Sequence, residues 1–386
     1  MTPTVPDPEP GAVARGWLDI IDHLPTGAPE RIPALVANGE REGPTLWVTG
    51  SLHGDEVTGM AVCQDIVHAE LPGRLAGRVV SLPNLNPAGL RRSTRRSYYD
   101  DEDPNRQFPD VAYATADADP GDTVDGPRPP SQQELVCRRL FDLFADNADA
   151  LLDMHTATVD SHPFVIQDRV LFGRGRRDRA AALELAGALD DLAAATGLPT
   201  VFEYPPGEYL DEGLHRSTSG SALNQAGIPA LTVELGTHSV VDERLHGQGV
   251  AAACRAMAHL GMVADAADAV PERLGSLPAP IPAPVPGQHR RHVGPRARPG
   301  EAGIVRHEVT AGDVVAEGDV VARVLDPTGD PASERLLRAD QDGWVLCRMP
   351  GVAAYEHTPV TWLAVADDGP RVGSPEEGTA DESSQG

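Results

Sequence analysis

Short apolar runs alternate with amphipathic runs between Trp17 and about His259, and this alternation limits the fold more than any other feature of the sequence. The short runs are rich in Val, Leu and Ile, as strands are, whereas the runs between them carry apolar residues at helical spacing. Such alternation is typical of an α/β protein with helices layered on a sheet. We expect strands at 33–37, 45–50, 78–84, 150–155, 163–167, 199–204 and 228–236, and helices at 57–70, 131–147, 177–196 and 243–261.

Changes in composition divide the rest of the chain. The text SLPAPIPAPVPGQ indicates a semi-rigid linker, and the short apolar runs with Gly-Asp turns that follow it indicate a compact all-β module. The acidic, Pro- and Gly-rich residues 110–130 are expected to form a long loop. The predicted organisation is a flexible lead (1–13), a main catalytic domain (14–275), a Pro-rich linker (276–300), a small β domain (301–366) and a disordered acidic tail (367–386).

The charged residues are strongly unbalanced. The chain has 58 Asp and Glu against 32 basic residues, a net charge of −26, and every basic residue is arginine. Without lysine, Schiff-base chemistry, Walker-type phosphate loops and lysine-attached biotin or lipoate are excluded. The net negative charge disfavours nucleic-acid partners. A dense acidic surface of halophilic type is expected, with codon bias as the alternative cause of the missing lysine.

Other whole-chain features favour a cytoplasmic protein with no membrane partner. No apolar run reaches the length of a membrane-spanning helix, and the first twenty residues lack the pattern of a secretory signal. The four cysteines lie far apart without a Cys-x-x-Cys pair, so we expect them to pack in the core rather than form disulfides.

Three predicted strands end at residues that bind metals or carry protons. His53 and Glu56 follow the strand at 45–50 in the text TGSLHGDEVTG, and His155 ends the strand at 150–155. Ligand sites of open α/β sheets gather at the carboxyl ends of strands, and two His with one Glu form a common catalytic zinc set. Glu234 ends a third strand and is a candidate general base beside such a site. The alternative for Glu234 is a salt-bridged residue that caps its strand.

The segment at 86–110, NPAGLRRSTRRSYYDDEDPNRQFPD, is unusually rich in arginine. A guanidinium group donates two parallel hydrogen bonds to a carboxylate, so such a segment near a metal predicts an anionic substrate group. A solvated run of charges that pairs with surface acids is the alternative.

Four motifs in this order, SLHGDE, NPAGL…STR…DPNRQFP, LLDMHT and ALTVELG, resemble the succinylglutamate desuccinylase/aspartoacylase family of the zinc carboxypeptidase clan. The resemblance covers about residues 30–265. It implies a three-layer mixed α/β sheet of zinc carboxypeptidase type, followed by a small C-terminal all-β domain of barrel-sandwich type. It also implies one zinc ion per chain.

The resemblance assigns a role to each matching residue of this chain. It implies zinc ligands at His53, Glu56 and His155, a catalytic carboxylate at Glu234, and an arginine at Arg95 that polarises the scissile carbonyl. It further implies substrate binding by Asn105, Arg106 and Tyr355, and an Asp103 that orients a zinc-binding histidine.

The implied function is removal of the acyl group from a small N-acyl amino acid with a free carboxylate. A carboxypeptidase-like metallopeptidase and a non-catalytic metal or metabolite binder are the alternatives. Acetyl-aspartate, succinyl-glutamate and acetyl-diaminobutyrate are all substrates at the level of the family. A homo-oligomer is left open.

Overall fold

A computed structural model gives the fold, and it describes residues 4–374 except 23, 25–26, 111–121, 124–125, 128, 174–176 and 352. Within these residues, none of the helices combines the length and the apolar character that crossing a bilayer requires. The loop expected at 110–130 lies mostly outside the described residues.

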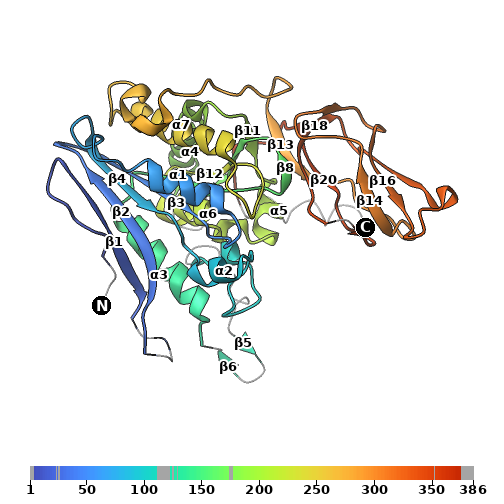
Figure 1. Cartoon of the computed structure of the whole chain (residues 1–386), viewed down its shortest axis with the longest axis horizontal. Coiled ribbons are helices and arrows are strands. Elements are labelled where there is room, and N and C mark those ends of the chain that lie inside the picture. The colour runs from blue at the N-terminus through green and yellow to red at the C-terminus, as the bar shows by residue number, and fades with distance from the viewer. Residues whose placement is uncertain are drawn as a thin grey trace.

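One large mixed sheet runs through the molecule, as the alternating sequence predicted (Figure 1). Its central strands β4, β3, β7 and β12 are parallel to one another, and β9, β11 and β13 form a second parallel group that meets β12 antiparallel. The strands in spatial order are β1 (Ala12–Ile21), β2 (Glu30–Asn38), β4 (Ala76–Leu82), β3 (Arg41–Gly50), β7 (Ala150–His155), β12 (Ala230–Glu234), β9 (Phe164–Gln167), β11 (Thr200–Phe202), β13 (His289–Val293), β20 (Thr361–Ala366), β18 (Gly343–Arg348) and β15 (Val314–Val315), with β8 (Val159–Ser161) beside β18.

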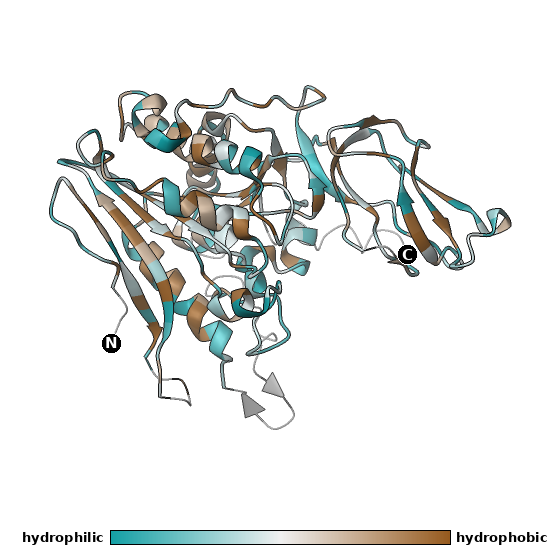
Figure 2. Ribbon diagram, viewed as in Figure 1, coloured by the Kyte–Doolittle hydropathy of each residue, from teal (hydrophilic) through white to brown (hydrophobic). Residues whose placement is uncertain are grey.

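Helices cover both faces of this sheet. The two faces can be told apart because neighbouring residues of a strand point to opposite sides. On one face, Gly59 of α1 lies against Met154 of β7, whose register partner on β12 is Val233. On the other face, Ser219 of α6 contacts Thr232, the residue of β12 next to Val233. In Figure 2 the helices change between brown and teal along their length, as expected of helices with one buried side. The helices are α1 (Val57–Asp65), α2 (Pro87–Arg92), α3 (Gln132–Asn147), α4 (Arg179–Thr196), α5 (Pro206–Asp211), α6 (Thr218–Ser221) and α7 (Glu243–His259), with short turns η1 (Pro104–Arg106), η2 (Leu214–Arg216), η3 (Ala222–Ala226), η4 (Ala266–Ala269), η5 (Glu272–Leu274) and η6 (Pro331–Ser333).

The C-terminal part has its own apolar core but shares the large sheet. A second sheet faces β18 and β20, and Val321, Leu337 and Leu363 are among the buried residues between them. Another apolar cluster joins the two parts, because Trp344 and Leu346 pack with Phe164 and Ile166 of the main part. The second sheet consists of β17 (Arg335–Arg338), β16 (Val320–Leu325), β14 (Gly303–His307) and β19 (Ala353–Ala354), and two small pairs are β10 (Val170–Leu171) with β21 (Val372–Gly373) and β5 (Asp122–Thr123) with β6 (Gly126–Pro127).

Three predicted boundaries differ from the structure. Within the lead expected at 1–13, the carbonyls of Pro6 and Pro8 accept hydrogen bonds from Arg78 and Asn38, and β1 begins at Ala12. The linker expected at 276–300 contains β13, which inserts into the sheet between β11 and β20. The tail expected at 367–386 contains β21, which pairs with β10, while residues 375–386 lie outside the described chain.

Candidate active site

The turn after β3 places His53 and Glu56 over the end of the sheet. Ser51 has a φ of 53°, so the chain bends sharply as soon as the strand ends. Gly54 then passes so close to Gly89 that a Cβ would lie 2.1 Å from its carbonyl carbon. Only glycine fits this approach. Two residues later, Glu56 directly precedes α1.

His155 and Glu234 are brought together by strand register. β7 and β12 are parallel neighbours, and Glu234 is the register partner of His155 where both strands end. Gly59 lets α1 pack closely on this end of β7, since a Cβ there would lie 2.6 Å from the Met154 carbonyl oxygen. This close packing places the start of α1, and with it Glu56, next to His155.

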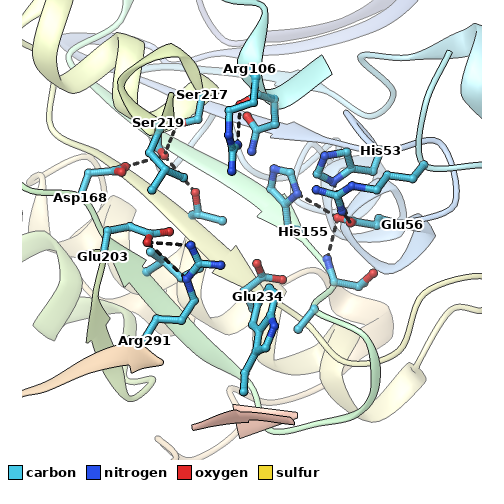
Figure 3. Close-up of a pocket in the computed structure, with 18 residues that line it drawn as sticks. His53, Glu56, Arg106, His155, Asp168, Glu203, Ser217, Ser219, Glu234 and Arg291 are labelled. Atoms are coloured by element: carbon cyan, nitrogen blue, oxygen red, sulfur yellow. Dashed lines mark hydrogen bonds and ion pairs between the residues drawn. The ribbon is translucent and has the colours of Figure 1, made fainter. Parts of the chain in front are cut away.

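Three side chains converge there on one small volume (Figure 3). Nδ1 of His53 lies 2.7 Å from Oε1 of Glu56, and Nδ1 of His155 lies 2.8 Å from Oε2 of the same carboxylate. One ligand atom from each residue falls within 4.8 Å of the others, and all three side chains are buried. Although burial favours the neutral acid, the charges of the two histidines hold the pKa of Glu56 well below its usual range.

Two further carboxylates fix the histidine rings. Nε2 of His53 is 3.0 Å from Asp103, and Nε2 of His155 is 2.8 Å from Asp153, whose other oxygen accepts a hydrogen bond from Thr49. Both rings therefore present Nδ1 to the centre of the cluster. Two imidazole nitrogens oriented by carboxylates, together with a glutamate, are the donor set of catalytic zinc sites, so these residues fit zinc.

Glu234 lies beside this cluster and is only 6% exposed. Its Oε2 atom is buried and has no hydrogen-bond partner in the described part of the chain. Burial, opposed by the His155 charge and assisted by the Glu56 charge, raises the pKa of Glu234 to about 7. A carboxyl group with a pKa near neutrality is suited to taking up and returning a proton.

The arginine-rich segment supplies donors to the same pocket. Arg95 contacts Asp103 at 2.9 Å and Glu56 at 3.3 Å, so it reaches the edge of the histidine cluster. Burial opposes the charge of Arg95, but Asp103 and Glu56 outweigh that effect and raise its pKa. Thr218 donates its backbone N–H to the side-chain oxygen of Asn105, which fixes the Asn105 amide.

Arg106 is held by two backbone carbonyls. Its Nε donates to Glu212 at 2.8 Å and its Nη1 to Asn105 at 2.7 Å. Within the described residues, neither Nη2 of Arg106 nor Nδ2 of Asn105 donates a hydrogen bond to the protein. Both side chains line the pocket, so two donors remain for an anionic group.

The predicted residues His53, Glu56, Arg95, Asn105, Arg106, His155 and Glu234 line this one pocket, and Asp103 lies directly behind His53. Tyr355 does not: its side chain is 70% exposed, next to β19 of the second sheet, and it is not among the residues that line the pocket. The short sequence match that selected Tyr355 therefore did not find a pocket residue.

The pocket has a second wall that the sequence analysis missed. Asp168, Glu203, Ser219 and Thr232 come from the main part, while Arg291 of β13 and Trp362 of β20 come from the C-terminal part. Asp168 and Glu203 each follow a strand directly in the structure. The reasoning that found His155 could have reached Asp168, but the strand expected at 199–204 ran past Glu203. Asp153 could also have been predicted as a neighbour of His155, because it stands two residues before it and residues two apart in a strand share a face.

Comparisons with known proteins identify one family. The model of the succinylglutamate desuccinylase/aspartoacylase catalytic domain matches residues 42–260, more than half of the chain. The N-alpha-acetyl-L-2,4-diaminobutyric acid deacetylase of Halomonas elongata is 26% identical over 326 residues, which cover 82% of this chain and 80% of that protein.

Solved structures show the same fold. The product-bound ectoine utilization protein EutE (DoeB) from Ruegeria pomeroyi superposes with a TM-score of 0.71 at 21% identity, covering 94% of this chain and 98% of that one. The succinylglutamate desuccinylase/aspartoacylase from Rhodobacter sphaeroides gives 0.67 at 21% identity, covering 92% and 96%. The chain belongs to the succinylglutamate desuccinylase/aspartoacylase family.

Proposed function

We propose that this protein is a zinc-dependent amidohydrolase that removes the acyl group from a small N-acyl amino acid. The observation that carries the proposal is that the His53, Glu56 and His155 cluster, the buried Glu234 and the free donors of Asn105 and Arg106 share one pocket. The similarity to a relative named as a deacetylase of an N-acetylated amino acid supports the same reaction class.

The residues of this chain have separable tasks. His53, Glu56 and His155 would hold the zinc ion, which when bound supplies a Lewis acid for the amide carbonyl and its attacking water. Glu234 accepts a proton from the attacking water and returns it to the leaving amine nitrogen. Arg95 donates to the carbonyl oxygen as negative charge develops there.

Asn105 and Arg106 bind the substrate carboxylate. Their free donors point into the pocket that Glu234 lines, so a bound carboxylate orients the amide toward Glu234. We expect Arg106→Ala chiefly to raise KM, because the variant removes the charge that anchors the substrate.

The finer features of the fold predicted from the sequence are part of this proposal. Helices on both faces of a mixed sheet support a three-layer arrangement of zinc carboxypeptidase type. The two facing sheets around the core of Val321, Leu337 and Leu363 support a C-terminal domain of barrel-sandwich type.

A peptidase with the same catalytic residues is the competing function. Arg291 and Trp362 of the C-terminal part form a wall of the pocket, which has about 510 Å³ of space free of atoms including open solvent at its mouth. This supports a substrate of amino-acid size rather than a long peptide.

The test is an assay of the zinc-loaded protein with N-acetyl amino acids, dipeptides and longer peptides, with released amino acids measured by mass spectrometry. We expect hydrolysis of the N-acetyl amino acids and little of the peptides. Faster cleavage of peptides would make the protein a peptidase, and bound zinc with no hydrolysis of either class would contradict both enzymatic functions.

A further inference from the structure

Two carboxylates stand side by side across the pocket from the histidine cluster. Gln167 of β9 pairs with Phe202 of β11 in parallel register, so the next residues, Asp168 and Glu203, leave neighbouring strand ends together. Both line the pocket although their residues are only 3% and 4% exposed. Figure 3 shows them on the side of the pocket opposite His53 and Glu56.

Glu203 is held rigidly with one oxygen free. Nε and Nη2 of Arg291 both donate to its Oε2 atom, at 3.2 and 2.8 Å. The Cζ atom of Arg291 also lies over the rings of Tyr204 and Trp362, at 4.8 and 4.9 Å from their centroids. In the described part of the chain, Oε1 of Glu203 accepts no hydrogen bond.

Asp168 has no cation of its own within hydrogen-bond distance. Its Oδ2 atom accepts a hydrogen bond from the Ser219 hydroxyl at 2.6 Å, and no ion pair joins it to the described residues. Burial first, and then the neighbouring Glu203 charge, raise the pKa of Asp168 to about 7. Arg291 forms an ion pair with Glu203 only, so within the described residues Asp168 has no ion-pair partner, although the charge of Arg106 acts on it through space.

We propose that Glu203, reinforced by Asp168, binds a cationic group on the substrate side chain, so that the preferred substrates are N-α-acyl diamino acids. This inference rests on the proposed function. With the substrate carboxylate at Asn105 and Arg106 and the acyl group toward the histidine cluster, the side chain enters the space beside Glu203. An ammonium group there contacts Glu203 Oε1 and supplies the charge that the wall lacks. An anionic side chain meets two carboxyl groups instead, and the Arg291 cation beside them is already bound to Glu203.

The test compares kcat/KM for three substrates of similar size: N-α-acetyl-L-2,4-diaminobutyrate, its neutral analogue N-acetyl-L-2-aminobutyrate, and the anionic N-acetyl-L-aspartate. A charge-assisted hydrogen bond in a buried site predicts a preference of about 10- to 100-fold for the cationic over the neutral substrate. Hydrolysis with equal rates for the two, or with the anionic substrate preferred, would overturn the inference and leave the deacylase function intact. If the protein hydrolyses none of the three nor any other N-acyl amino acid, it is the proposed function that fails.

Variants assign the preference to the wall. Glu203→Gln and Asp168→Asn should each reduce the ratio of cationic to neutral kcat/KM toward one. Asp168→Asn keeps the shape of the side chain, so it tests the charge even if Glu203→Gln disturbs Arg291. Glu208→Gln, at an exposed position of α5 near this wall, is the matched control, and its ratio should equal that of the parent.

A binding measurement gives a second readout that needs no turnover. Calorimetry with the free amino acids L-2,4-diaminobutyrate and L-2-aminobutyrate should show tighter binding of the diamino acid to the zinc-loaded parent protein, and loss of that difference in both wall variants. A variant that keeps the full difference would remove its residue from the cation site.

Discussion

Glu234 and His155 are register partners on the adjacent parallel strands β12 and β7, each the last residue of its strand. This relationship places a buried carboxyl group beside a histidine of the three-residue cluster, and Glu234 Oε2 has no hydrogen-bond partner in the described protein. A group that is buried and unpaired costs stability. Its position is therefore best explained by a task in the reaction.

Glu234→Gln should keep zinc and lose catalysis. The amide fills the same space but cannot take up a proton, and general acid–base catalysis contributes roughly 10²–10⁴-fold. We expect kcat to fall by about 10³-fold or more, with one zinc per chain by elemental analysis. An undiminished kcat would remove the base assignment, whereas loss of zinc would make Glu234 part of the metal site.

Asp153→Asn should weaken metal binding without removing a ligand. Asp153 holds Nε2 of His155 at 2.8 Å, and loss of such a partner typically reduces metal affinity by about 10- to 100-fold. Competition with a chelator would measure the change. Asp103→Asn tests the same effect at His53, where the aspartate is more exposed to solvent, so we expect a smaller loss there. Unchanged zinc affinity in both variants would show that the rings need no carboxylate to orient them.

The catalytic half of the site could be predicted from the sequence because its residues stand at the ends of apolar strands. His53, His155 and Glu234 each follow or end such a strand, and parallel strands bring those ends to one edge. The same logic reaches Asp168, which follows the strand expected at 163–167, but the strand expected at 199–204 ran past Glu203, and no motif marks either acid.

Arg291 lay beyond the reach of sequence patterns. Its strand, β13, reads His-Arg-Arg-His-Val and is teal in Figure 2, so it lacks the apolar spacing by which strands are recognised. It forms because β11 and β20 offer backbone partners on both sides, which is a tertiary effect. The same limit explains why the assignment of Tyr355 to the pocket was wrong. A match of three residues does not determine where the chain lies relative to the pocket.

Asp367→Ala should destabilise the fold although the residue lies in a segment with the composition of a disordered tail. Its carboxylate contacts Arg169 at 2.7 Å, and the two side chains are 3% and 0% exposed. Removal of one partner leaves a buried charge unpaired, which costs about 3–5 kcal/mol. Urea unfolding would measure the loss. Asp368→Ala, at the exposed neighbouring position, is the matched control. Equal stability of the two variants would show that Arg169 finds another partner.

Asp168 should make the stability of the protein depend on pH in a direction opposite to that of most acidic groups. The groups that act on its charge are Glu203, the hydroxyls of Ser219 and Tyr209, and Arg106. Burial first, and then the Glu203 charge, raise its pKa to about 7 in the folded protein, against about 3.9 in an unfolded chain.

The direction of this pH dependence follows from the difference in proton uptake between the folded and unfolded states. Between about pH 4 and pH 7 the folded state holds a proton on Asp168 that the unfolded state has released, so this contribution to the free energy of unfolding falls as pH rises. A shift of about three units corresponds to a loss on the order of 4 kcal/mol across that window. Asp168→Asn removes the titrating group while keeping its shape, so the variant should gain stability relative to the parent as pH rises from 4.5 to 8. Unfolding of metal-free protein over this range measures the difference, with Asp146→Asn on the exposed side of α3 as the control for the substitution itself. A difference between parent and variant that does not change with pH would mean that Asp168 is ionised throughout, and that the wall tolerates both negative charges without a ligand.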